Sequence, residues 1–132
     1  MNRKPDCIFC QIVHKQAPAH VVCEDDRTLV FMDIFPVADG HTLIIPKAHC
    51  DDLFGADPDD LRAVIDRSRE VAHAIGRVLS PDGLGVFQLN GAAAGLSLAV
   101  SVVLSPVLLA ALGLERFTTD GGFEMSSPRC RR

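Results

Sequence analysis

The sequence predicts an α+β domain in which an antiparallel sheet packs against one long helix, with a short helix before it. Three β-rich runs follow one another closely, at His20–Cys23, Thr28–Asp33 and His41–Pro46, and such short connections join antiparallel strands. An amphipathic helical pattern then extends from Asp57 to about Leu79. With 132 residues, 48% of them hydrophobic and 23% charged, the chain has the size and composition of a folded domain.

Both helices are indicated by their apolar spacing. Residues 6–15 predict a short helix whose apolar face consists of Ile8, Phe9, Ile12 and Val13. Residues 57–60 (Asp-Pro-Asp-Asp) are a strong helix start, because Asp can cap a helix, Pro suits its first position and carboxylates are favoured at its positive end. We expect eight apolar side chains of this long helix to share the face that packs on the sheet: Leu61, Val64, Ile65, Val71, Ala72, Ile75, Val78 and Leu79.

The C-terminal third of the chain has an unusual composition, because no charged residue occurs from Gly83 to Leu114. A fourth strand is predicted at Leu84–Asn90, and the apolar run that follows predicts a fifth, buried strand at Leu98–Leu104 with a covering helix at Val107–Leu114. A membrane segment is disfavoured by a central proline and three serines, and a poorly ordered end is the remaining alternative. We therefore expect a domain at 1–106, followed at 107–132 by an apolar segment and a polar, Arg-rich tail.

Composition also excludes some classes of function. A net charge of −4 and only 5% aromatic residues, with no Trp or Tyr, argue against nucleic-acid binding. The five cysteines are an odd number and the N-terminus lacks a secretory apolar region, which favours a cytoplasmic protein. The C-x-x-C pair Cys7 and Cys10 suits half of a zinc site, a redox dithiol or two small buried hydrophobic residues.

Four blocks occur in order along the chain: Cys7–Val13, Glu24–Ile34, Gly40–His49 and Asn90–Gly95. In order and spacing they resemble the histidine triad (HIT) family of nucleotide-binding hydrolases and transferases, over about residues 5–95. The resemblance implies a HIT-like α+β fold with a five-stranded antiparallel sheet. It also implies a homodimer formed through the helix and a sheet edge.

The resemblance further implies a nucleotide site. Asp33 would accept hydrogen bonds from the ribose hydroxyls, Asn90 would help to position the phosphate, and Ser97 retains a hydroxyl that could touch phosphate. Taken without the resemblance, Asp33 could be a turn residue at the end of a strand, and Asn90 is better explained as a turn former before Gly91. The apolar residues are then equally well explained as ordinary core. The walls of the purine pocket would be Ile8, Phe9, Ile12, Phe31 and Ile34.

Cys7, Cys10 and His49 resemble three of the four ligands of zinc-containing members. A structural zinc site takes four ligands, and the expected fourth, a histidine after Gly95, is missing from the sequence. We therefore expect weak or absent zinc binding, and Cys50 is the first residue to test as a replacement ligand.

The family's His-x-His-x-His motif is also missing. Its three positions fall on Val100, Val102 and Leu104, and no aliphatic side chain can attack phosphorus or carry a proton. The sequence thus predicts a catalytically impaired relative of nucleoside phosphoramidate and dinucleoside polyphosphate hydrolases that binds a purine nucleotide such as AMP. The alternative is a structural or interaction module with a vestigial pocket. His41, at a strand entry, is interpreted as a structural or surface residue.

Overall fold

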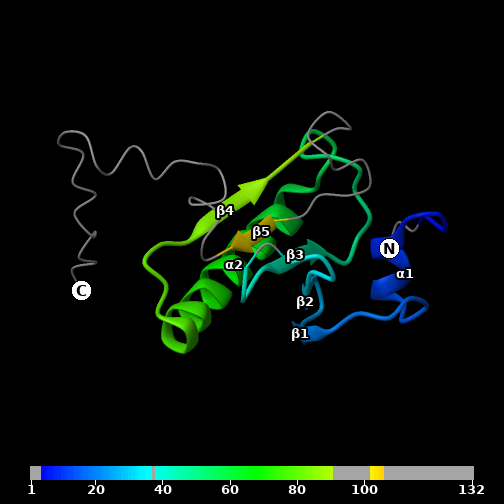
Figure 1. Cartoon of the computed structure of the whole chain (residues 1–132). Coiled ribbons are helices and arrows are strands. Elements are labelled where there is room, and N and C mark those ends of the chain that lie inside the picture. Colours follow the sequence, from blue (N-terminus) through cyan, green and yellow to red (C-terminus); the bar gives the residue numbers. More distant parts are fainter. Residues whose placement is uncertain (1–3, 37, 91–101, 106–132) are drawn as a thin grey trace.

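The computed structural model describes residues 4–36, 38–90 and 102–105. The five strands form one antiparallel sheet in the order β1-β2-β3-β5-β4. Figure 1 shows the long helix α2 lying along the sheet and the short helix α1 beside the N-terminus. This arrangement confirms the predicted α+β fold. The elements are α1 (Ile8–Val13), β1 (Val21–Glu24), β2 (Thr28–Met32), β3 (Thr42–Pro46), α2 (Pro58–Leu79), β4 (Gly85–Gln88) and β5 (Val102–Ser105).

The core has two layers because side chains along a strand alternate between the two faces of the sheet. One face packs against α2, and the other packs against α1 and the chain around it. On the α2 face, the buried residues are Val30, Ile44, Val64, Val71, Ile75, Val102 and Leu104. On the α1 face, Leu29, Phe31, Leu43 and Ile45 are buried, with Phe9, Ile12, Val13, Ala19 and Val103 packed against them.

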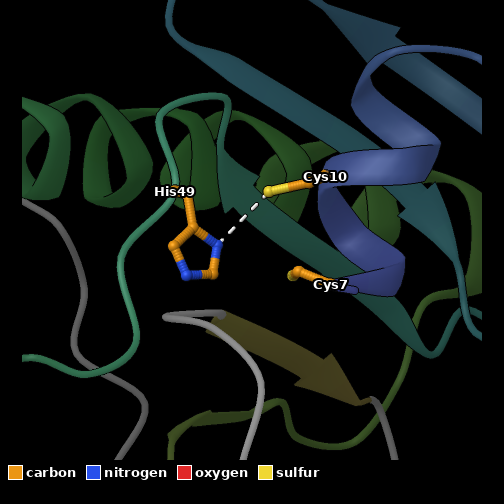
Figure 2. Close-up of side chains that lie close together, drawn as sticks. All are labelled: Cys7, Cys10 and His49. Atoms are coloured by element: carbon orange, nitrogen blue, oxygen red, sulfur yellow. Dashed lines mark hydrogen bonds between the residues drawn. The ribbon is translucent and has the colours of Figure 1, made fainter. Parts of the chain in front are cut away.

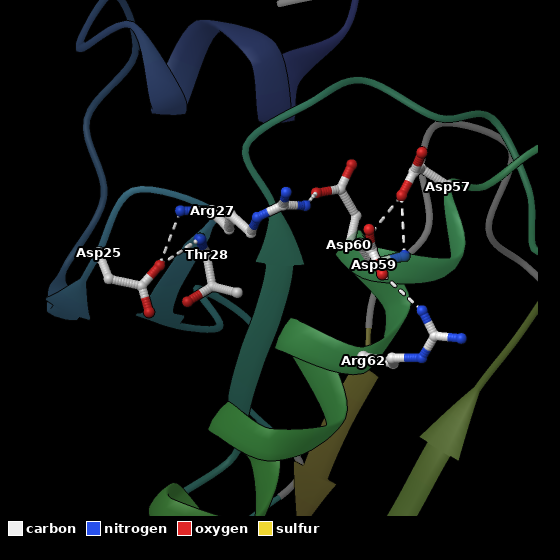
Figure 3. Close-up of polar contacts among 7 residues, drawn as sticks. All are labelled: Asp25, Arg27, Thr28, Asp57, Asp59, Asp60 and Arg62. Carbon is white, nitrogen blue, oxygen red and sulfur yellow. Dashed lines mark hydrogen bonds and ion pairs between the residues drawn. The ribbon is translucent and has the colours of Figure 1, made fainter.

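Helix α2 begins as predicted. The Asp57 carboxylate accepts hydrogen bonds from the backbone N–H groups of Asp59 (2.8 Å) and Asp60 (3.4 Å), as Figure 3 shows. These bonds satisfy donors that have no partner within the helix. Asp60 also pairs with Arg27 at 2.8 Å, which ties the start of α2 to the turn between β1 and β2.

The predicted buried face of α2 is only partly correct. Val64, Val71 and Ile75 are buried, but Ser68 lies among them, where its hydroxyl donates to the carbonyl of Val64 at 2.7 Å. Its polar group is therefore satisfied inside the helix. The prediction is wrong for Ile65, Val78 and Leu79, which are 57%, 79% and 42% exposed. Ile65 points away from the sheet, whereas Val78 and Leu79 lie in the last turn of the helix.

A second polar contact joins α2 to the β1–β2 turn. Asp25 closes this turn by accepting hydrogen bonds from the backbone N–H groups of Arg27 and Thr28 (Figure 3). Its other oxygen pairs with the guanidinium of Arg67 on α2, which holds the pKa of Asp25 well below its usual range. The carboxylate of Asp25 thus closes the turn and also binds it to the helix, in addition to the Arg27–Asp60 pair.

Several predicted features lie outside the described residues: the first part of the fifth strand, the covering helix at 107–114, the domain boundary at 106, and the candidate residues Ser97 and Val100. The described part of the predicted strand forms β5, which pairs with both β3 and β4. Within the described residues, no helix combines the length and apolarity that a membrane crossing requires.

Candidate functional site

The two cysteines of the N-terminal motif and one histidine meet beside α1 (Figure 2). The ligand atoms of Cys7, Cys10 and His49 all lie within 4.8 Å of one another, and Cys10 Sγ is 3.3 Å from His49 Nδ1. A tetrahedral zinc site with bonds of about 2.0–2.3 Å would place such atoms roughly 3.3–3.8 Å apart. The three side chains are therefore a candidate metal site that needs only a small contraction.

The surroundings of His49 suit a ligand role. Its Nε2 donates to Asp51 Oδ1 at 3.0 Å, which leaves the lone pair on Nδ1 directed at Cys10. A carboxylate on the second ring nitrogen is the usual partner of a metal-binding histidine, because it fixes the tautomer and the ring orientation. Lys4 also binds Asp51, at 3.0 Å, and with His49 it lowers the pKa of that carboxyl.

The donor set is buried but incomplete among the described residues. Cys7 and Cys10 are 1% and 5% exposed, and the side chain of His49 is 6% exposed. Cys50 does not join them, because its thiol donates to the carbonyl of Asp52 at 3.0 Å. Within the described residues the structure therefore gathers three ligands, with no sign that Cys50 is the fourth.

The predicted purine wall forms in part. The rings of Phe9 and Phe31 have centroids 5.9 Å apart and are inclined by 60°, and Ile12 packs against the same cluster. Ile8 and Ile34 lie outside the buried cluster, at 41% and 70% exposed. The structure thus brings Phe9, Ile12 and Phe31 together, whereas Ile8 and Ile34 are exposed beside them.

Asp33 follows β2 on the face that carries Phe31, and its carboxylate is held from two sides. Its Oδ1 accepts a hydrogen bond from the backbone N–H of Phe35 at 3.0 Å, and its Oδ2 lies 3.1 Å from His41 Nε2. The side chains of Asp33 and His41 are 28% and 10% exposed. His41 is therefore buried and not on the surface, and it is paired with Asp33.

Asn90 has local partners in this structure. Its side-chain oxygen accepts a hydrogen bond from the backbone N–H of Leu53 at 2.8 Å, and its amide donates to Gln88 at 2.7 Å. These bonds join the end of β4 to the loop that follows His49. Asn90 thus fixes the position of that loop.

The two described motif positions on β5 face α2. Val102 and Leu104 are 3% and 0% exposed and pack with Ile44 and the helix. The β5 side chain that faces the Phe31 side of the sheet is Val103. The three β5 residues in these two clusters all carry aliphatic side chains: Val102, Val103 and Leu104.

Sequence reasoning missed the roles of His41 and Asp51. Strands β2 and β3 are paired so that Met32 lies opposite Thr42, which places Asp33 next to His41. The signal was weak, because nine residues (33–41) connect the two strands and a connection of this length does not fix which residues lie opposite each other. For Asp51, the signal was a carboxylate two residues after a candidate histidine ligand.

Known proteins resemble this chain over most of its length. The model of the HIT domain matches residues 14–99, a range that begins after Cys7 and Cys10. An uncharacterized HIT-like protein of Mycoplasma genitalium is 39% identical over 94 residues, which are 71% of this chain and 67% of that protein. The chain thus spans about two-thirds of the length of this curated relative.

Solved structures are similar as well. A Zn-bound histidine triad family protein from Mycobacterium smegmatis has a TM-score of 0.72 at 33% identity, covering 76% of this chain and 74% of that one. A hypothetical histidine triad nucleotide-binding protein from Sulfolobus tokodaii has a TM-score of 0.70 at 32% identity, covering 76% and 68%.

Proposed function

Because this chain belongs to the HIT domain family, we propose that it binds a purine nucleoside monophosphate and does not cleave it. The similar Sulfolobus tokodaii protein is described as nucleotide-binding. The observation that carries the proposal is the Asp33 carboxylate, held by His41 and a backbone N–H at the end of the strand that carries Phe31.

Asp33 has the capacity to accept both ribose hydroxyls. An ionised carboxylate has about four acceptor positions, and one position on each oxygen is already occupied, by Phe35 and by His41. One position on each oxygen therefore remains for two vicinal hydroxyls. The apolar side chains of Phe9, Ile12 and Phe31 would face the base, and Ile8 and Ile34 would close over it from their exposed positions. Asn90 and Ser97 would act on the phosphate side.

The lack of cleavage follows from the side chains of β5. In-line attack on phosphorus needs a nucleophile and a proton donor for the leaving group. Val102, Val103 and Leu104 supply neither, and the third motif position, Val100, is also aliphatic. We therefore expect binding without a nucleotidyl-enzyme intermediate.

A zinc ion would be held by Cys7, Cys10 and His49, with Asp51 orienting the imidazole. Its role would be structural, since it would join α1 to the loop after β3. Binding would be weak, because a structural zinc site takes four protein ligands and the described residues supply three. The proposed cytoplasmic location would keep the two thiols reduced. Proposed homodimers would form through α2 and the β4 edge of the sheet.

Isothermal titration with AMP tests the proposal. We expect saturable binding by the full chain and a loss of at least about tenfold in affinity for Asp33→Ala, since a hydrogen bond to a charged group contributes roughly 1.5–3 kcal/mol. Asp66→Ala is the matched control, because this exposed carboxylate lies on α2 and should leave affinity unchanged.

Two results would contradict the proposal. No binding at millimolar AMP would favour the interaction module with a vestigial pocket. Recovery of a covalent AMP adduct by mass spectrometry would show that another residue acts as a nucleophile.

A further inference from the structure

An apolar groove of about 400 Å³ lies on the side of the sheet opposite Asp33, between the C-terminal half of α2 and strands β1 to β3. At its rim, the guanidinium of Arg67 pairs with Glu70, so these two charges are matched by each other. The groove therefore offers apolar surface to a partner. Its apolar lining consists of Val22, Met32, Val71, Ala74, Ile75, Val78 and Leu79.

The apolar stripe of α2 continues past the part of the helix that the sheet covers. Val71, Ile75 and Val78 lie at spacings of four and three residues, which places them on one face of the helix. Val71 and Ile75 are 8% and 7% exposed, but Val78 is 79% exposed. Across the groove, Val22 of β1 is 54% exposed. Contiguous exposed apolar surface of this kind marks a contact site.

The last described strand, β5, ends next to this groove. Leu104 of β5 lies opposite Thr42 of β3, and both Thr42 and Gly40 line the groove. Because β5 and β3 are antiparallel, the C-terminal end of β5 points towards Gly40. The next residues include the uncharged segment 107–114, Val-Leu-Leu-Ala-Ala-Leu-Gly-Leu. Each residue spans at most about 3.6 Å, so this segment begins within roughly 10 Å of Ser105.

We propose that segment 107–114 of the same chain docks in this groove and covers Val78. A short tether gives the segment an effective concentration of about millimolar, which favours it over the same segment of a second chain in dilute solution. The groove and the segment are both apolar, so docking removes apolar area from water on each side. The proposal concerns the α2 face and is independent of nucleotide binding at Asp33.

Disulfide trapping in the full chain tests this contact, since Cys23 lines the groove and is in no disulfide among the described residues. Leu109→Cys and Leu112→Cys are made separately in a Cys130→Ser background, and the protein is oxidised mildly at low micromolar concentration. We expect at least one of the two new thiols to form an intrachain disulfide with Cys23, mapped by mass spectrometry. Ser126→Cys, outside the segment, is the control for random collision.

A second pair of variants tests the groove itself. Val78→Asp should lower the yield of the trapped disulfide roughly tenfold, because a carboxylate cannot be buried in an apolar contact without cost. Ile65→Asp is the matched control on α2 and should not change the yield, since Ile65 is exposed and does not line the groove. Circular dichroism checks that each variant is folded.

Three outcomes would overturn the proposal. Yields at 109 and 112 that equal the yield of the Ser126→Cys control would show that the segment does not dock. Disulfides that join two chains would assign the groove to a second copy. A yield unaffected by Val78→Asp in a folded protein would place the segment elsewhere.

Discussion

The two halves of the sheet differ in what their side chains do. At the end of β2, Asp33 is paired with His41, and its carboxylate still has acceptor positions to offer. On β5, Val102 and Leu104 pack against α2, and Val103 packs on the opposite face. One half therefore retains polar groups suited to recognition, while the described residues of the other contribute core packing. If Asp33 binds a nucleoside as proposed, recognition would depend on β2 and attack on phosphorus on β5, so aliphatic side chains on β5 would not by themselves abolish binding.

The largest expected effect comes from returning a histidine to β5. Val102→His places an imidazole among Ile44, Val64 and other buried residues, where it has no hydrogen-bond partner. We expect a loss of about 3 kcal/mol or more in the free energy of unfolding, measured by urea denaturation. Val103→His, on the partly exposed opposite face, should cost clearly less.

Equal losses for the two variants would contradict the facing of β5 in this structure. A more stable Val102→His than Val103→His would show that the motif positions face the Phe31 side. The two halves of the sheet would then differ only in which side chains they carry, and not in the face on which those side chains lie.

A smaller effect is expected at His41, which orients the Asp33 carboxylate through a 3.1 Å contact. If AMP binds as proposed, His41→Ala should weaken it by roughly fivefold, since one hydrogen bond contributes about 1 kcal/mol. Asp33→Ala should weaken it more, because it removes the acceptor itself. His41→Gln can retain a donor and should recover part of the affinity in the same titration. If His41→Ala left the affinity for AMP unchanged, His41 would have no part in nucleotide recognition.

The smallest effect concerns Asp25, whose pKa is lowered chiefly by the hydrogen bond from Arg67. A depressed pKa stabilises the fold above the unfolded-state value of about 3.9 and loses that contribution as pH falls below it. Asp25→Asn should therefore lower stability at pH 6 and have less effect at pH 2. The side chain is 41% exposed, so solvent screening keeps the difference small. Urea denaturation at the two pH values measures it, and an equal loss at both would exclude the ion pair as the cause.

The sequence predicted the order of the elements because their signals are local. The cap at Asp57 and the antiparallel strands were all found where expected. Burial on α2 was less predictable, because the sheet does not extend over the last turn and Ser68 can satisfy its hydroxyl within the helix. The Asp33–His41 pair depends on strand register, which apolar periodicity alone does not fix. The C-x-x-C spacing indicated Cys7 and Cys10 as candidate metal ligands and the family resemblance added His49, and the structure brings all three together.

Helix α1 has a consequence for ligand affinity. It contains only six residues and has no side-chain cap, so it cannot be stable by itself and depends on Phe9 and the Cys10–His49 contact. Local unfolding of α1 would remove Phe9 and Ile12 from the pocket wall while leaving the sheet intact. If a nucleotide binds as proposed, its measured dissociation constant would equal the intrinsic one divided by the fraction of molecules in which α1 is docked. Any ion that joins Cys7 and Cys10 to His49 would raise that fraction, and nucleotide affinity would follow the concentration of the ion.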